Sequence, residues 1–224
     1  MQSSLAVLYS GGLDSAILLA HLATQQRPIQ PIYIDSSLAW QASEERAARR
    51  FLAALDSRWV APLVVLSLPL ADLYADHWSI TGRGVPQADE ADEQVYLPGR
   101  NPLLLVKADL WCRLHGVSQL AIGALATNPF ADATDRFFQT FSAAMDEAAG
   151  GKVELVRPLG KLDKRQVMRL AEHAPLELTF SCLAPSGDLH CGTCNKCAER
   201  QHAFRDAGLA DRTPYAAAAR SITI

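Results

Sequence analysis

Six residues from Ser10 to Ser15, Ser-Gly-Gly-Leu-Asp-Ser, combine two glycines, two hydroxyls and a carboxylate directly after an apolar run. Glycines permit a tight turn that brings backbone N–H groups close to an anion, and a helix starting there adds partial positive charge. The lysine of a Walker A loop and the third glycine of the dinucleotide fingerprint are missing. We predict a phosphate-binding loop of another kind. The alternative is a glycine-rich turn in which Asp14 and Ser15 only cap the helix.

A second group able to do chemistry consists of four cysteines, Cys182, Cys191, Cys194 and Cys197. The last three are spaced three residues apart, so their sulfurs can converge on one ion, and four thiolates are typical of structural zinc. A pair of disulfides would instead require an oxidising compartment. The sequence therefore predicts a Zn²⁺ site. The fifth cysteine, Cys112, lies in an apolar helical pattern and is predicted to be a buried core thiol.

Strand-like apolar runs alternate with helical patterns along the chain, which is typical of a parallel sheet with crossover helices. The predicted strands are residues 5–9, 29–34, 63–68, 119–123 and 153–156. The predicted helices include residues 17–22, 47–55, 101–115, 134–149 and 163–172, the last opening with a D-x-x-Q variant of the capping box. We therefore expect an α/β fold with a doubly wound, five-stranded parallel sheet, in which the phosphate loop joins the first strand to the first helix.

Two segments depart from this alternation. Residues 69–98 are long, polar and rich in acidic residues, which favours a lid over the carboxyl edge of the sheet, with a solvated insertion as the alternative. After Leu178 the sheet pattern stops and the cysteine cluster begins. We predict one domain over residues 1–178 and a small helical zinc-binding module over residues 179–224.

Composition excludes several classes of protein. The 224 residues are 49% hydrophobic and 20% charged, which argues against disorder, and the net charge of −3 does not favour a general nucleic-acid binder. The densest apolar stretch, residues 61–71, carries two prolines and falls short of the roughly 18 residues that a membrane span needs. The first residues lack the pattern of a secretory signal. We therefore expect a cytoplasmic protein with no membrane partner.

The loop and the cysteines together resemble a known family. Ser-Gly-Gly-x-Asp-Ser is similar to the pyrophosphate loop (PP-loop) of the ATP pyrophosphatases. With Cys-x8-Cys-Gly-x-Cys-x2-Cys at the other end, the chain resembles the 7-cyano-7-deazaguanine synthases of queuosine biosynthesis. Landmarks between and beyond the two motifs agree with this family over nearly the whole chain: residues 96–101 (YLPGRN), Ser181-Cys182, Pro158-Leu159 with Lys164, and residues 211–215 (DRTPY).

The resemblance implies an enzyme that uses ATP and Mg²⁺ to adenylate the carboxylate of 7-carboxy-7-deazaguanine. Ammonia then displaces AMP to give an amide, and a second activation gives the nitrile. It implies a C–N ligase that releases AMP and pyrophosphate, and a homodimer. The expected catalytic residues are Asp14, Ser15, Arg100 and Lys164. The expected nucleotide-binding residues are Ser10, Gly11, Gly12, Asp14, Ser15 and Asp35.

Two stretches depart from the family pattern. Residues 33–37 (YIDSS) replace the family's F-D-Y-G-Q-R-H and keep Asp35 but not the polar run behind it. The second departure is in the predicted acceptor loop. Where the family has an acidic D-x-S-G-Y-P-D-C-R loop, residues 126–136 read ATNPFADATDR. The residues expected to bind the acceptor are Asn101, Asn128, Phe130, Asp132 and Asp135, and a flat heteroaromatic carboxylate is the acceptor that we predict. Two alternatives stay open: an enzyme that adenylates a tRNA base or a protein carboxylate, and a zinc-bearing nucleotide-binding module without catalysis.

Overall fold

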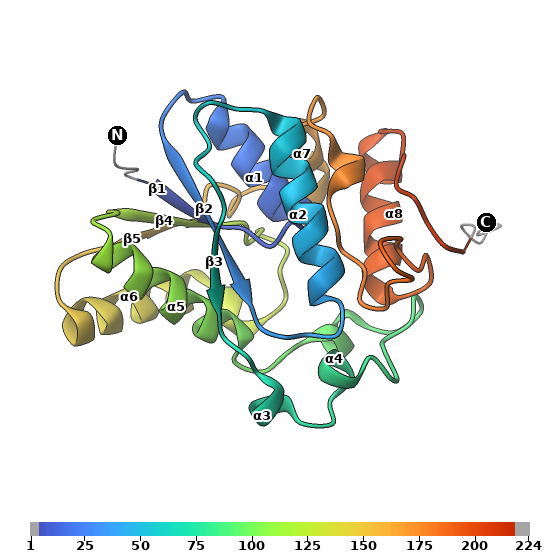
Figure 1. The fold of residues 1–224 in the computed structure, drawn as a ribbon, viewed down its shortest axis with the longest axis horizontal. Coiled ribbons are helices and arrows are strands. Elements are labelled where there is room, and N and C mark those ends of the chain that lie inside the picture. Colours follow the sequence, from blue (N-terminus) through green and yellow to red (C-terminus); the bar gives the residue numbers. More distant parts are fainter. Residues whose placement is uncertain (1–4, 218–224) are drawn as a thin grey trace.

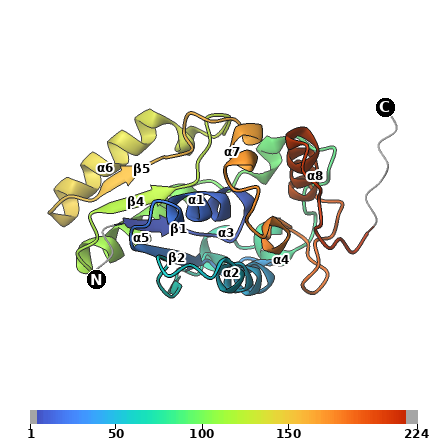
Figure 2. The same cartoon turned by 90° about the horizontal axis from the view of Figure 1, so that it is seen from above.

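The computed structural model describes residues 5–217 and contains a five-stranded parallel sheet between two helix layers (Figures 1 and 2). Its strands are β1 (Leu5–Leu8), β2 (Ile29–Asp35), β3 (Val64–Ser67), β4 (Gln119–Ile122) and β5 (Glu154–Val156). They lie in the order β3-β2-β1-β4-β5, and all neighbours are parallel. The predicted doubly wound α/β fold is confirmed.

The helices pack on both faces because successive strand residues point to opposite sides of a sheet. Leu5 and Val7 of β1 join a core with α1 (Leu13–Ala23), α2 (Gln41–Leu55) and α7 (Lys164–Leu170). Ala6, between them, joins the core beneath α5 (Arg100–Leu114) and α6 (Asp135–Ala149). Both faces of the central strand are therefore buried, which explains its continuous apolar sequence.

The predicted helices are present with small changes at their ends. The capping box at the start of α7 is confirmed, with the Asp163 side chain accepting from the Gln166 backbone N–H at 2.8 Å. That helix ends at Leu170 rather than at residue 172, because Ala171 leaves the helical conformation. Cys112 is fully buried in the core under α5, as predicted, and burial raises the pKa of its thiol to about 12.

Residues 69–98 contain more structure than a lid loop would. They form α3 (Ala71–Tyr74), α4 (Trp78–Thr81) and a 3₁₀ helix at Asp92–Val95. Their backbone is tied to the cysteine-rich segment: Asn195 N–H donates to the Pro86 carbonyl at 2.9 Å, and Ala88 N–H donates to the Thr193 carbonyl at 3.0 Å. The segment is therefore held in place by packing that no local sequence pattern reveals.

The C-terminal helix α8 (Asn195–Ala207) stands beside α7 at the carboxyl edge of the sheet (Figure 1). Its residues Ala203, Phe204 and Ala207 belong to the same core as α1. Residues 218–224 of the predicted 179–224 module lie outside the described part, and the division at residue 178 stays a prediction. Within residues 5–217, no helix has the length and apolar character that crossing a membrane requires.

Candidate active site

The strand order reverses between β1 and β4, and this is where open parallel sheets bind ligands. Ser10 to Ser15 follow β1 and lead into α1 at this point. The Ser10 and Ser15 hydroxyls lie 3.1 Å apart, and Ser15 Oγ also donates to the Gly12 carbonyl at 3.1 Å. The loop is therefore fixed by its own side chains, and it stands at the N-terminus of an eleven-residue helix.

Two glycines allow the loop to pack this closely. Gly11 has φ +79°, and a Cβ on it would lie 2.8 Å from the Ala48 Cβ of α2. Gly123, directly after β4, approaches the loop from the other side, and a Cβ there would lie 3.2 Å from both the Asp14 carbonyl carbon and the Ser15 nitrogen. Sequence reasoning missed Gly123, although a glycine directly after a central strand can mark such a close approach.

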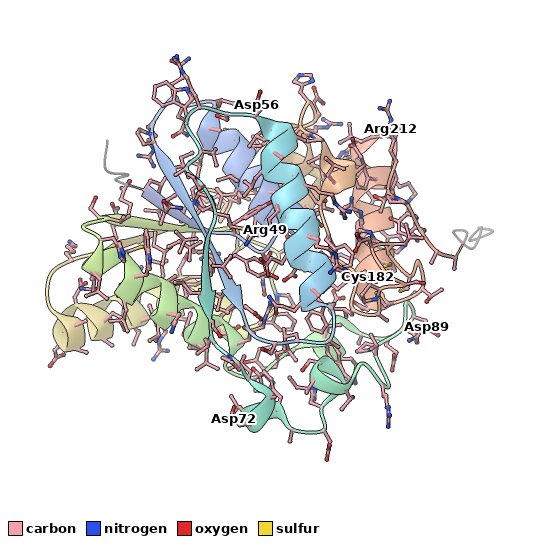
Figure 3. The ribbon with its side chains drawn as sticks, viewed as in Figure 1. Arg49, Asp56, Asp72, Asp89, Cys182 and Arg212 are labelled. Carbon is pink, nitrogen blue, oxygen red and sulfur yellow. The ribbon has the colours of Figure 1, made fainter. Side chains whose placement is uncertain are left out.

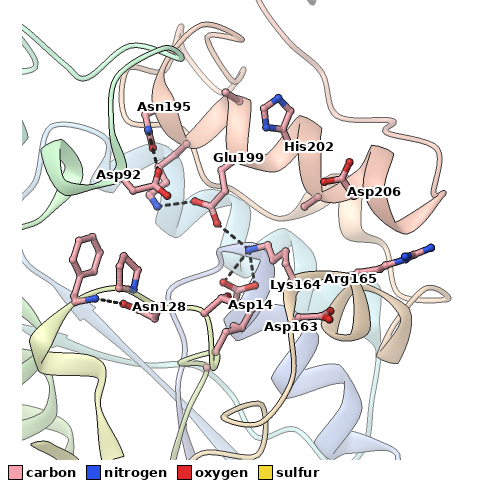
Figure 4. Close-up of a pocket in the computed structure, with 18 of the residues that line it drawn as sticks. Asp14, Asp92, Asn128, Asp163, Lys164, Arg165, Asn195, Glu199, His202 and Asp206 are labelled. Carbon is pink, nitrogen blue, oxygen red and sulfur yellow. Dashed lines mark hydrogen bonds and ion pairs between the residues drawn. The ribbon is translucent and has the colours of Figure 1, made fainter. Parts of the chain in front are cut away.

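A chain of alternating charges crosses the front of the loop (Figure 4). Lys164 Nζ lies 2.8 Å from Asp14 Oδ1 and 3.1 Å from Glu199 Oε1, and Lys196 Nζ lies 2.6 Å from Glu199 Oε2. Burial lowers the pKa of Lys164, but the Asp14 and Glu199 carboxylates outweigh it and raise the pKa above its ordinary value. Burial raises the pKa of Glu199, but the two lysines outweigh it and bring the pKa to about 2. Lys164 and Glu199 therefore stay charged at neutral pH.

Two hollows meet at this charged chain. An open cleft of about 720 Å³ lies between the 88–92 segment, the 123–130 loop and helices α7 and α8. A smaller cavity of about 300 Å³ runs from the phosphate loop toward the N-terminal ends of α2 and α5. The residues that line both are Asp14, Gly123, Asn128, Lys164, Lys196 and Glu199. The charged chain is therefore accessible from both sides.

Trp40, Glu44, Arg100 and Asn101 line the smaller cavity but not the open cleft, and they form the end of the cavity at α2 and α5. Glu44 is 7% exposed, and the hydroxyl of Tyr33 donates to its Oε2 at 2.9 Å. Burial raises the pKa of Glu44 to about 7, although the charge of Arg100 opposes the shift. This end of the cavity therefore holds a carboxyl group whose charge is poorly solvated.

The predicted acceptor loop divides into residues inside and outside the cavity. Asn128 lines it, and the Asn128 Oδ1 accepts from the Phe130 N–H at 3.0 Å. The Phe130 ring lies 4.9 Å from that of Tyr96 and borders the open cleft. Asp132 is buried behind Asn101, whose Nδ2 donates to its Oδ1 at 3.2 Å, and burial raises the pKa of Asp132. Asp132 thus contacts the cavity through Asn101.

Two expected site residues lie apart from this arrangement. The Asp135 side chain is 85% exposed at the start of α6 and pairs with Arg157. Asp35, at the end of β2, accepts from the Ser37 N–H at 2.9 Å and lies outside both hollows. The structure therefore brings together the phosphate loop, Lys164, Arg100, Asn101 and Asn128, but leaves these two carboxylates apart.

The four cysteines meet at the base of α8, and Figure 3 shows Cys182 beside that helix. Their Sγ atoms all lie within 4.8 Å of one another, and Cys191 Sγ is 3.8 Å from Cys197 Sγ. Two thiolates on one tetrahedral zinc are separated by about 3.8 Å, given Zn–S bonds of about 2.3 Å. Backbone N–H groups also point at the sulfurs, including Cys191 N–H at 3.1 Å from Cys182 Sγ. The four cysteines fit a zinc ion.

The same cluster places the charges of α8. Cys194 is the residue that precedes the first turn of α8, and Cys197 lies in that turn. Lys196 and Glu199 therefore leave the helix close to the cysteines, and Glu199 is joined to the phosphate loop through Lys164 and Asp14. Sequence reasoning missed both, because nothing in the sequence around α8 indicates the contact of Glu199 with Lys164 of α7.

A model of the family described as queuosine biosynthesis protein QueC matches residues 4–208. This chain belongs to the QueC family. Three curated proteins named 7-cyano-7-deazaguanine synthase are similar to it. The protein of Solidesulfovibrio magneticus is 30% identical, covering 93% of this chain and 94% of its own. Those of Koribacter versatilis and Methanothrix thermoacetophila are each 29% identical, covering 94% and 93% of this chain and 92% and 96% of their own.

Membership of the QueC family covers both motifs on which the resemblance rested, and it confirms that resemblance. The matched region begins before the phosphate loop and ends after all four cysteines. Glu44, which lines the smaller cavity, is a further site residue that sequence reasoning passed over. A signal was present, because Glu44 lies three residues before Ala47 on the helix face that carries Phe51 and faces the core. A charged residue on a buried helix face marks either a buried pair or a site.

Proposed function

We propose that this QueC family member is an ATP-dependent C–N ligase that converts 7-carboxy-7-deazaguanine to 7-cyano-7-deazaguanine. The names of the curated relatives and the full-length coverage support this proposal. The observation that carries it is Lys164, held by Asp14 and Glu199 directly beside the phosphate loop and facing a cavity. Such a cation, fixed before the reaction, can stabilise charge that develops on a phosphate.

The chain's own groups suit the binding of ATP. The N–H groups of residues 10–15 and the N-terminus of α1 would hold the phosphates, with Lys164 as the cation. Mg²⁺ would enter with the phosphates, since it retains waters and binds through few carboxylates, and Asp14 and Glu199 supply oxygen donors at this place. Zn²⁺ in the cysteine cluster would have a structural role, because a site closed by four thiolates leaves no open position.

The proposed reaction has two activations. The acceptor carboxylate attacks the α-phosphorus of ATP and pyrophosphate leaves; ammonia then attacks the acyl carbon, and AMP leaves to give the amide. The amide oxygen then attacks the α-phosphorus of a second ATP and pyrophosphate leaves, and loss of AMP with two amide protons in all gives the nitrile. Carboxylate oxygen is a poor leaving group and AMP a good one, so no side-chain nucleophile is required. Arg100, at the far end of the cavity, would bind the acceptor carboxylate or the α-phosphate.

The test incubates the protein with ATP, Mg²⁺, ammonium and 7-carboxy-7-deazaguanine and follows the mass of the acceptor. We expect an amide and then a nitrile, with AMP and pyrophosphate released in step. Pyrophosphate release without a change in the acceptor would favour the second candidate, adenylation of a different acceptor such as a tRNA base or a protein carboxylate. The unusual 126–136 loop supports that candidate. No ATP cleavage with any acceptor would favour the non-catalytic module.

Three further features are proposed from the family resemblance and the sequence. They are a homodimer, a cytoplasmic location, and a division into residues 1–178 and 179–224. Sedimentation at several protein concentrations tests the first, fractionation of cells tests the second, and limited proteolysis near residue 178 tests the third.

A further inference from the structure

Glu44 is a buried carboxyl group at the end of the smaller cavity, about one turn into α2. It is 7% exposed, and its neighbours along the cavity wall are Trp40, Arg100 and Asn101. Its position differs from that of Glu45, the next residue, which faces outward and pairs with Arg49 at 2.7 Å. One of two adjacent glutamates is therefore turned into the cavity and the other is not.

The hydrogen bonds of Glu44 only partly replace the solvation that its buried carboxylate has lost. The Tyr33 hydroxyl donates to Oε2 at 2.9 Å, and the side chain of Trp40 also donates to the carboxyl group. No lysine or arginine among the described residues lies within ion-pair distance of it. Burial raises the pKa of Glu44 to about 7, and Arg100 opposes this shift from a longer distance. A carboxylate in this position gains most from a ligand that brings its own N–H donors.

The geometry points to the kind of ligand edge that Glu44 takes. A carboxylate can accept two parallel N–H bonds from an amidine, the arrangement found on the ring N–H and exocyclic amino group of a guanine-type base. The adenine of ATP offers an acceptor nitrogen beside its amino group, and that nitrogen repels a carboxylate. We propose that Glu44 reads the 2-amino edge of a guanine-type acceptor and makes the smaller cavity selective for it. This inference rests on the proposed function and names the residue that sets its acceptor.

The surroundings of Glu44 suit a flat, polar ring. Trp40 is nearly buried and stacked on Trp78 at 5.8 Å, so its position is fixed. Asn101 is fixed by Asp132. The Nε of Arg100 is buried and has no hydrogen-bond partner within the described part of the chain. An acceptor in this cavity would therefore meet a carboxylate and an amide that are held in place before it binds, together with a guanidinium that has a donor to spare.

The experiment measures binding of two acceptors to the full-length protein by calorimetry: 7-carboxy-7-deazaguanine and its analogue without the 2-amino group. We compare wild type with Glu44→Gln, which keeps the shape and the bond from Tyr33. Glu45→Gln is the matched control. We expect Glu44→Gln to lower the affinity for the 2-amino acceptor about 10- to 100-fold, because the hydrogen bonds to a charged carboxylate are lost. The affinities for the analogue and for ATP are expected to stay within about threefold of the wild-type values. Glu45→Gln is expected to leave all three unchanged.

Equal weakening of both acceptors would overturn the inference, since it would assign Glu44 a structural role. The inference would also be overturned if Glu44→Gln preferred the 2-amino acceptor over its analogue by the same factor as the wild type. Failure of the wild type to bind or convert either acceptor would overturn the proposed function itself. If Glu44→Gln does not fold, Tyr33→Phe replaces it: the carboxylate then remains without its orienting hydroxyl, and we expect the preference for the 2-amino acceptor to fall several-fold. An unchanged preference in Tyr33→Phe would contradict the inference.

Discussion

Two glutamates that line the smaller cavity have opposite electrostatic environments. Glu199, at the phosphate end, lies between Lys164 and Lys196, and these lysines bring its pKa to about 2 against the effect of burial. Glu44, at the other end, has hydroxyl and indole donors in place of cations, and burial raises its pKa to about 7. The first is part of a neutralised network. The second is a charge that the free protein solvates poorly.

The difference indicates how each end is prepared for its ligand. A phosphate group is itself strongly charged, so the end that receives it holds its lysines in place with paired carboxylates. A guanine-type heterocycle offers N–H donors and no charge, so the carboxylate that binds it must have oxygen lone pairs free to accept hydrogen bonds. Sites of this kind reduce the stability of the free protein in exchange for selectivity. The following predictions test whether the two ends are as separate as this comparison implies.

The largest expected effect follows removal of zinc. We expect one zinc per chain, bound by Cys182, Cys191, Cys194 and Cys197, with a binding free energy on the order of 10 kcal/mol coupled to folding of this segment. Because α8 carries Lys196 and Glu199, chelation is expected to abolish ATP binding before acceptor binding. Elemental analysis and calorimetry with each ligand measure this. Cys112→Ala, outside the cluster, is the control that retains the metal. Two disulfides in freshly purified, reduced protein would contradict the prediction.

The second effect is loss of the cation at the phosphate end. Lys164→Ala removes the cation that bridges the carboxylates of Asp14 and Glu199, and leaves Glu199 with Lys196 alone. We expect pyrophosphate release to fall about 1000-fold, or about 4 kcal/mol, since groups fixed opposite developing charge contribute on this scale. Lys161→Ala, at an exposed lysine of the preceding turn, serves as the control and is expected to retain full rates. Normal release by Lys164→Ala would remove this residue from the mechanism.

The third effect is a pH-dependent gain of stability in Glu44→Gln. Because the pKa of Glu44 is raised from 4.5 to about 7, the folded protein holds this proton more tightly than the unfolded chain does. Its contribution is therefore present below pH 4.5 and is lost as pH rises to about 7, by about 3 kcal/mol. Gln carries no such proton, so the variant is expected to gain stability over wild type as pH rises through this window. Urea unfolding of both proteins at pH 5 and pH 8 measures the difference.

A constant difference between the two proteins at pH 5 and pH 8 would mean that Glu44 is solvated as an ordinary surface carboxylate. The same titration of Glu45→Gln is the control, and it is expected to follow the wild type at both pH values.

The smallest effect separates two aspartates of the 126–136 loop. Asp132→Ala releases Asn101, and we expect acceptor affinity to fall about tenfold with little change for ATP, as for the loss of one hydrogen bond to a charged group. Asp135→Ala removes an exposed partner of Arg157 and is expected to change neither affinity. Equal loss of ATP and acceptor binding in Asp132→Ala would show that the loop does not select the acceptor.

The sequence predicted those features whose residues are contiguous or regularly spaced. The strands, the phosphate loop after β1, the α7 capping box and the converging cysteines follow from local patterns. Features that are assembled from segments far apart in the chain could not be predicted from the sequence. The contact of Lys164 with Glu199 joins two helices, and the cavity around Glu44 joins α2 with α5. Likewise, residues 69–98 look like a loop in sequence because their backbone partners lie about 100 residues further along the chain.

The contact between Gly11 and Ala48 has a consequence for how the two ligands bind. Ala48 stands one helical turn after Glu44, and Gly11 has no room even for a methyl group against it. We expect any displacement of α2 by a bound ligand to move the phosphate loop as well, because the two are in direct contact here. We therefore expect the two affinities to be coupled, and such coupling is reciprocal: the factor by which ATP changes acceptor affinity equals the factor by which acceptor changes ATP affinity. The order of addition affects only the rates at which the same ternary complex forms.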